Sequence, residues 1–222
     1  MLLLNSNNLG EQALNKLATL ALQSHFESAQ NLDVQVKTDP NLLAQGRLAS
    51  LTLDGTGLVL SGQTRLRALQ LHLQSIAVSP FKALVGQIEL TEPTQGSACL
   101  VLGEADCARA LAAGQGRPSL HCYCRADGTL TLRLEPRRAS AAVEIVLRPQ
   151  LSPAGDRVVC EVIAASSSPP TNLLAHLERL LNLEAFVLPG LSLKPLQLRV
   201  ETGRIVIQAA ARLTHFPNSK AA

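Results

Sequence analysis

The segment His121-Cys122-Tyr123-Cys124 is the densest local group of side chains that could bind a metal or react as nucleophiles. In a strand, Cys122 and Cys124 share one face, while His121 points to the other face. A zinc ion needs about four ligands in tetrahedral geometry, and the sequence has no second Cys pair at a spacing that would complete the set. Two small apolar side chains lining a core are the simpler interpretation, so we expect no metal and no cofactor.

Charged side chains offer two further sites at which chemistry could occur. Glu104 and Asp106 resemble a catalytic carboxylate pair, but two positions apart on a helix they point in different directions. Acidic residues in a first helical turn are explained by the helix dipole. A basic stretch is formed by Arg133, Arg137, Arg138 and Arg148. This stretch either contacts an anionic headgroup or phosphate, or forms a solvated strand face that resists edge pairing.

The common catalytic and nucleotide-binding motifs are missing from the sequence. It contains no Gly-x-Ser-x-Gly, no Gly-rich phosphate loop ending in Lys-Ser/Thr, no His-Glu-x-x-His and no Gly-x-Gly-x-x-Gly. The five histidines each fall on a different predicted element: His25, His72, His121, His176 and His215. We therefore expect no enzyme and no catalytic residues, because an active site would need scattered His, Asp and Arg side chains to converge in the fold.

The first secondary-structure element predicted along the chain is a helix over residues 9–30. An apolar stripe at helical spacing is formed by Ala13, Leu14, Leu17, Leu20 and Ala21. Leu22 and Phe26 lie on a second face, so the helix should be covered on more than one side. About 22 residues at ~1.5 Å each would make a rod of roughly 33 Å.

From residue 32 onward the apolar period changes to two, which predicts short strands separated by turns. Strands are predicted near residues 32–36, 48–53, 69–73, 87–90, 97–102, 120–125, 130–134, 143–147, 158–164, 191–201 and 204–213. Gly55 and Gly57 are expected to form a turn after the second strand, and Asp127-Gly128 predicts a hairpin. Two further short helices are predicted at 104–113 and 171–183.

Strands that follow one another without intervening helices favour an α+β fold with an antiparallel sheet over repeated βαβ units. The long first helix fits most economically in the concavity of a curved sheet. We predict a single domain over residues 1–222, with a loop break near 165–170 and a frayed tail at 218–222.

The composition narrows the class of protein. Of the 222 residues, 46% are hydrophobic, 17% are charged and only 2% are aromatic, so the chain should fold around an aliphatic core. A net charge of +3 with one Tyr, four Phe and no Trp argues against nucleic acid as a partner. Mild positive charge does suit an anionic membrane surface.

The cellular location is inferred from the absence of a recognisable signal peptide, a transmembrane helix and a disulfide pattern in the sequence. Residues 1–8 carry no basic region, and Asn5 ends their apolar run, so they do not resemble a signal peptide. No apolar run is long enough for a transmembrane helix. Five cysteines are an odd number, which predicts reduced thiols. We expect a cytoplasmic protein, with peripheral association at a membrane left open.

Several segments, in their order and spacing, resemble the LmeA-like phospholipid-binding family of bacterial proteins. These segments are 39–46 with its Pro-x-Leu-Leu-x-x-Gly pattern, 50–58, 83–90, 98–111 and 188–191, followed by a closing hairpin to Phe216-Pro217. The resemblance implies a fold similar to tubular lipid-binding (TULIP-like) proteins, in which a curved antiparallel sheet wraps a long helix and holds lipid in an apolar groove. The family has no catalytic motif that could be transferred to this chain.

The resemblance implies non-enzymatic binding of a phospholipid or another acyl-chain lipid. The residues expected to line the groove are Leu14, Leu17, Ala21, Leu22, Phe26, Leu69, Leu71 and Leu73, and the four arginines above are the headgroup candidates. The same aliphatic residues would fill an ordinary core equally well. The alternative is a packed scaffold or protein-interaction module, whose helix at 171–183 docks on a partner, a membrane or a second copy. The sequence leaves open whether the protein forms a homodimer.

Overall fold

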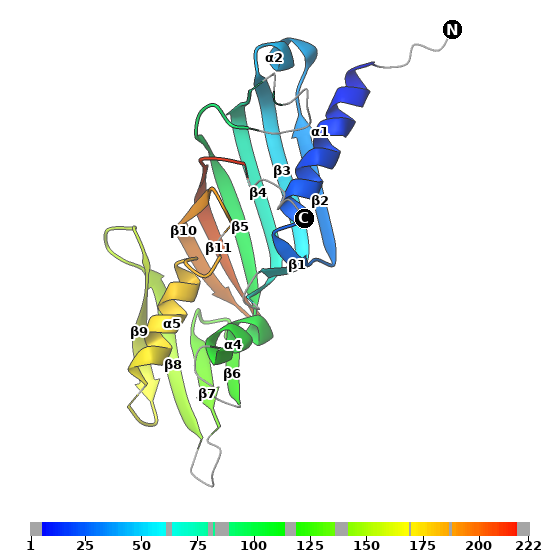
Figure 1. Cartoon of the computed structure of the whole chain (residues 1–222). Helices are drawn as coiled ribbons and strands as arrows, with labels where there is room; N and C mark the ends of the chain where they lie inside the picture. The colour runs from blue at the N-terminus through cyan, green and yellow to red at the C-terminus, as the bar shows by residue number, and fades with distance from the viewer. Residues whose placement is uncertain are drawn as a thin grey trace.

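The structure is a computed structural model that describes residues 6–60, 64–79, 82, 89–113, 119–135, 142–168, 170–186 and 188–216. Figure 1 shows an elongated molecule in which two antiparallel sheets follow each other along the long axis, with helices packed against them. This arrangement confirms the predicted α+β class.

The larger sheet contains seven strands in the order β1-β3-β4-β5-β11-β10, with β2 also pairing with β3. Its strands are β1 (Phe26–Ser28), β2 (Asn31–Lys37), β3 (Arg47–Leu60), β4 (Arg65–Ala77), β5 (Thr94–Gly103), β10 (Leu191–Glu201) and β11 (Arg204–Leu213). All pairings are antiparallel. The sheet therefore joins the first half of the chain to its C-terminal hairpin.

The smaller sheet contains four strands from the middle of the chain. They run in the order β6 (Leu120–Cys124), β7 (Leu130–Leu134), β8 (Val143–Leu151) and β9 (Val158–Ala165). The predicted hairpin between β6 and β7 is confirmed, with Gly128 at a φ of 82° in the left-handed region that glycine adopts readily. Helices α4 (Glu104–Ala113) and α5 (Thr171–Leu181) lie on one face of this sheet (Figure 1).

The first helix is shorter than predicted. Helix α1 covers Ser6–Gln23, 18 residues, and the chain then turns so that Phe26 begins β1 opposite Leu60 of β3. Leu22 and Phe26 keep helical spacing, and neither Gly nor Pro follows Gln23, so no local stop signal marks the end of the helix. Helix α1 runs beside β2 (Figure 1), where the Asn15 Oδ1 accepts a hydrogen bond from the Val36 N–H at 2.6 Å.

One further helix was not predicted. In addition to α4 and α5, the described residues contain α2 (Pro40–Ala44), which lies inside the Pro-x-Leu-Leu-x-x-Gly pattern. The Asp39 carboxylate caps its N-terminus by accepting from the Leu42 N–H at 2.8 Å, and Gly46 follows at a φ of 68°. The pattern is thus a capped single turn that redirects the chain into β3.

The turn predicted at Gly55 and Gly57 is wrong, because β3 continues through both residues for 14 positions. A Cβ on Gly55 would lie 2.8 Å from Cδ1 of the buried Leu58 side chain. Gly57 has a φ of 58°, which a side chain rarely adopts. Both glycines therefore serve packing and local backbone geometry within a strand that does not end there.

The larger sheet has one apolar and one polar face. On the apolar face a cross-strand row of buried residues runs through Val34, Leu53, Leu71, Ala98, Ala209 and Pro195. The adjacent row on the other face consists of Asp33, Asp54, Gln70, Cys99, Gln208 and Gln197. One hydrophobic cluster extends from α1 across the apolar face into the smaller sheet.

Candidate functional site: an aliphatic face and a charged pocket at its edge

The eight residues predicted to line a groove come together in one aliphatic cluster. Leu14, Leu22 and Phe26 are buried, and Leu17 and Ala21 are half-buried against the same core. Three residues of β4 complete the group on the apolar face of the larger sheet: Leu69, Leu71 and Leu73. The structure therefore brings helix and strand residues that are distant in sequence to the same side of the sheet.

The centre of this apolar face is lined with small residues that sequence analysis did not single out. Ala98 of β5 pairs with Ala209 of β11, and Gly96 pairs with Ala211. A Cβ on Gly96 would lie 2.0 Å from the His72 carbonyl oxygen, so β4 and β5 approach closely at this point. These alanines are buried, so small side chains occupy the part of the face between the leucines of β4 and strand β10.

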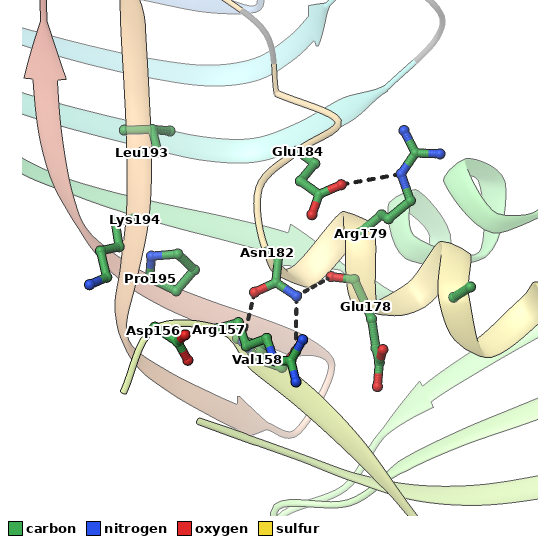
Figure 2. A pocket seen from close by; sticks show the side chains of 11 residues that line it. Asp156, Arg157, Val158, Glu178, Arg179, Asn182, Glu184, Leu193, Lys194 and Pro195 are labelled. Carbon is green, nitrogen blue, oxygen red and sulfur yellow. Dashed lines mark hydrogen bonds and ion pairs between the residues drawn. The ribbon is translucent and has the colours of Figure 1, made fainter. Parts of the chain in front are cut away.

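A pocket of about 380 Å³ opens where the β10 edge of the larger sheet meets α5 and the start of β9. We call it the edge pocket (Figure 2), and its lining residues are Asp156, Arg157, Val158, Ala175, Glu178, Arg179, Asn182, Glu184, Leu193, Lys194 and Pro195. Pro195 ends the buried row described above, and Leu193 pairs with Ala211. The edge pocket is therefore continuous with the apolar face of the larger sheet.

The frame of the edge pocket is held by the Asn182 side chain, which joins α5 to β9 (Figure 2). Its Oδ1 accepts from the Val158 N–H at 2.6 Å, and its Nδ2 donates to the Val158 carbonyl at 2.9 Å and to the Glu178 carbonyl at 2.8 Å. The oxygen and the nitrogen of the Asn182 side-chain amide thus both have hydrogen-bond partners. These bonds hold the end of α5 against the start of β9, the two elements that form walls of the pocket.

Six charged side chains surround the edge pocket, three basic and three acidic. Arg179 pairs with Glu184 at 3.3 Å, and the Glu178 carboxylate accepts from the Cys160 N–H at 3.0 Å. The Ser152 hydroxyl donates to Asp156 at 2.5 Å and lowers the pKa of that carboxyl, and the nearby charges of Arg157 and Lys194 lower it further. Asp156 is therefore an anion at neutral pH.

The predicted headgroup arginines lie elsewhere. Arg133 on β7 and Arg148 on β8 are exposed on the smaller sheet, and neither lines the edge pocket. Each faces a carboxylate across the sheet, because Arg133 pairs with Glu144 and Arg148 pairs with Glu161. The other two members of the stretch, at positions 137 and 138, lie outside the described residues. Arg133 and Arg148 thus each have an acidic neighbour and do not form a purely basic patch.

The cysteines at 122 and 124 face the core, as their spacing predicted. Hydrogen bonding to Cys107 and Cys124 and burial all raise the pKa of Cys122, and burial raises the pKa of Cys160 to about 12. Glu104 accepts from the Cys124 N–H at 2.6 Å, which gives this carboxylate a structural role. In the described part of the chain, no three His, Cys, Asp or Glu side chains are arranged to hold a metal ion.

A second hollow of about 560 Å³ lies on the polar face of the larger sheet. The His72 ring, which lines it, is bonded at Nδ1 to the Thr52 hydroxyl at 3.1 Å and at Nε2 to the Gln74 amide at 2.9 Å. Both ring nitrogens are thus engaged within the sheet, so this hollow offers no free histidine for acid–base chemistry.

Comparison with known proteins gives one result that covers nearly the whole chain. Residues 6–210 match the LmeA-like phospholipid-binding family. No curated protein and no solved structure matches the chain. Among the described residues, no helix has the length and apolar character needed to cross a membrane.

Proposed function

Because the chain belongs to the LmeA-like phospholipid-binding family, we propose that it binds a phospholipid without catalysing a reaction, with the acyl chains on the apolar face of the larger sheet. Helix α1 would then form one wall of the lipid site and the sheet the other, as the resemblance to tubular lipid-binding proteins implies. In this proposal the protein works at the surface of a membrane, from which it takes or to which it delivers lipid.

The observation that carries the proposal is the continuous aliphatic row from β2 to β10. The row crosses five strand-to-strand spacings of ~4.8 Å, about 24 Å in total. One leaflet of a bilayer contributes about half of a ~30 Å hydrocarbon core, roughly 15 Å. The face is therefore long enough for an acyl chain, and each buried CH₂ group would stabilise the complex by about 0.8 kcal/mol.

Native mass spectrometry of the purified protein, followed by lipid extraction, tests this proposal. We expect phospholipid to co-purify at a defined stoichiometry. Replacing Leu17 and Ala21 together with Asp should remove the lipid, because two carboxylates would then face the acyl chains. The matched control is Leu20→Asp on the same helix, where the side chain is 54% exposed and lipid should be retained.

A second variant guards against misfolding of the double mutant. Ala98→Leu enlarges a small buried side chain on β5 without adding charge, so it should reduce the amount of bound lipid while the circular dichroism spectrum stays that of the parent protein. Full lipid content in a folded L17D/A21D protein would overturn the proposal. A lipid-free parent protein that stays lipid-free after incubation with vesicles would favour the packed interaction module.

A further inference from the structure

We propose that the edge pocket binds the headgroup of a phospholipid whose phosphodiester carries a hydrogen-bond-donating end, such as hydroxyl groups or a primary ammonium. The inference rests on the proposed lipid-binding function and specifies the class of lipid. It assigns the headgroup to residues on α5, on β10 and in the turn before β9, and not to the arginines of the smaller sheet.

The phosphodiester would bind to two basic residues of the edge pocket, Arg157 and Lys194 (Figure 2). No ion pair among the described residues includes either of them, whereas Arg179, the third basic residue of the pocket, is paired with Glu184. Guanidinium and ammonium groups are the usual partners of phosphate oxygens in proteins. Both are also close enough to Asp156 to lower the pKa of its carboxyl.

The carboxylates of the pocket determine which headgroups fit beside the phosphate. Once the Arg179–Glu184 pair is set aside, Asp156 and Glu178 balance Arg157 and Lys194, so the remaining set has no net charge. Ionised carboxylates accept hydrogen bonds and donate none. A hydroxyl or primary ammonium can donate to them, a trimethylammonium group cannot, and a second phosphate would be repelled.

The position of the edge pocket connects it to the proposed acyl site. Pro195 and Leu193 line the pocket and also belong to the apolar face, where they pair with Ala209 and Ala211. A lipid whose chains lie along that face can therefore place its phosphate at the β10 edge without crossing the sheet. The volume of about 380 Å³ is in the range of small-molecule pockets, roughly 300–1,000 Å³.

Soluble headgroup analogues test the pocket independently of acyl chains. Nuclear magnetic resonance titrations of the full chain would use glycerophosphoglycerol, glycerophosphoethanolamine, glycerophosphocholine and inorganic phosphate as probes. The first two should shift the Asn182 side-chain amide and the Val158 amide signals, since both groups frame the pocket. Glycerophosphocholine and inorganic phosphate should need about tenfold higher concentration, the loss expected for a missing charged hydrogen bond.

Three variants assign the roles of the residues. Arg157→Gln with Lys194→Gln should abolish the shifts caused by all probes, whereas Arg199→Gln, an exposed arginine on β10 outside the pocket, should leave them unchanged. Asp156→Asn should narrow the difference between glycerophosphoglycerol and glycerophosphocholine, because the amide keeps an acceptor for Ser152 but loses the charge, while Glu178 remains. Equal binding of all four probes to the parent protein would overturn the proposal, as would binding that survives the double variant.

Lipid extraction separates this inference from the proposed function. If the R157Q/K194Q protein retains as much lipid as the parent with the same headgroups, and no probe shifts the pocket signals, the inference fails while lipid binding stands. If the probes bind as expected but the parent protein carries and takes up no lipid, the headgroup pocket stands and the acyl site fails.

Discussion

At the scale of single residues, the turn at Asp127 shows how one carboxylate organises a hairpin. Its Oδ1 accepts from the Thr129 hydroxyl at 2.6 Å and from the Thr129 N–H at 3.0 Å. These two hydrogen bonds lower the pKa of Asp127, the side-chain bond having the larger effect. The ionised carboxylate therefore accepts these two hydrogen bonds more strongly than the protonated acid would.

The first prediction concerns the pH dependence of this turn. Because the pKa of Asp127 is lower in the folded state than in the unfolded chain, its contribution to stability is present above the ordinary carboxyl pKa and is lost as pH falls through the folded-state value. Thr129→Val should raise the Asp127 pKa towards its ordinary value, measured by NMR titration. Ser152→Ala should move the Asp156 pKa and leave that of Asp127 unchanged, and equal movement of both would contradict the assignment.

Individual side chains were predictable from sequence where a local pattern decides their environment. The spacing of Cys122 and Cys124 was enough to place both in the core, and the first-turn position of Glu104 was enough to indicate a structural role. The edge pocket was not predictable, because Arg157 and Lys194 are separated by α5 in the sequence, lie in or next to different sheets and meet only in the tertiary fold. Likewise, the acids opposite Arg133 and Arg148 depend on a register that the sequence does not specify.

At the scale of elements, three strand edges carry features that discourage pairing with another chain. Helix α1 runs beside β2, and Asn15 satisfies the Val36 N–H there. Strand β10 contains Pro195 at a shift in register, and a shift also occurs between β8 and β9. Proline and bulges at edges oppose strand addition. Exposed apolar side chains at β9 and β10 therefore do not by themselves indicate a dimer interface.

The second prediction concerns the link between α5 and β9. Asn182→Ala removes three hydrogen bonds in a partly buried site, so it should lower the free energy of unfolding by about 2–4 kcal/mol. Urea denaturation measures this change. Asn172→Ala, at an exposed position of the same helix, should have an effect below about 0.5 kcal/mol. Similar effects of the two substitutions would mean that the link does not stabilise the fold.

Most strands were predictable because one face of each is buried and the other is not, which produces a clean period of two. The boundaries that failed are those where a tertiary contact overrides the local pattern. The end of α1 is set by the pairing of Phe26 with Leu60, although Phe26 continues the helical spacing of Leu22. Strand β3 passes through Gly55 because this residue pairs with Leu32 of β2 and Leu69 of β4, and the glycine leaves room for Leu58.

At the scale of the whole molecule, the two sheets share one hydrophobic cluster. The cluster runs from Leu14 on α1 to Val158 on β9, and the Gly203 N–H in the β10–β11 turn donates to the Cys124 carbonyl of β6 at 3.3 Å. A shared core favours a single cooperative unfolding transition, because neither sheet can lose its packing without exposing the other.

The third prediction follows from this shared core and uses the single tyrosine of a chain without tryptophan. Tyr123 lies on β6, so its fluorescence reports the smaller sheet, whereas far-ultraviolet circular dichroism reports both sheets. We expect the two signals to change at the same urea concentration. Separate midpoints would show instead that the sheets are two domains, in contrast to the predicted single one.

The strand order of the larger sheet has a consequence for the synthesis of the protein. Strand β5 ends at Gly103, yet its second neighbour, β11, begins only at Arg204 and lies inside the sheet, between β5 and β10. During synthesis, all strands of the smaller sheet therefore leave the ribosome before β10 and β11 can complete the larger sheet. Until then the growing chain presents the unpaired backbone of β5, beside a face of leucines, to solvent or to any chaperone that binds it. A chain that terminates before residue 204 would retain that open edge, so the larger sheet depends on β11 to cover a strand made about a hundred residues earlier.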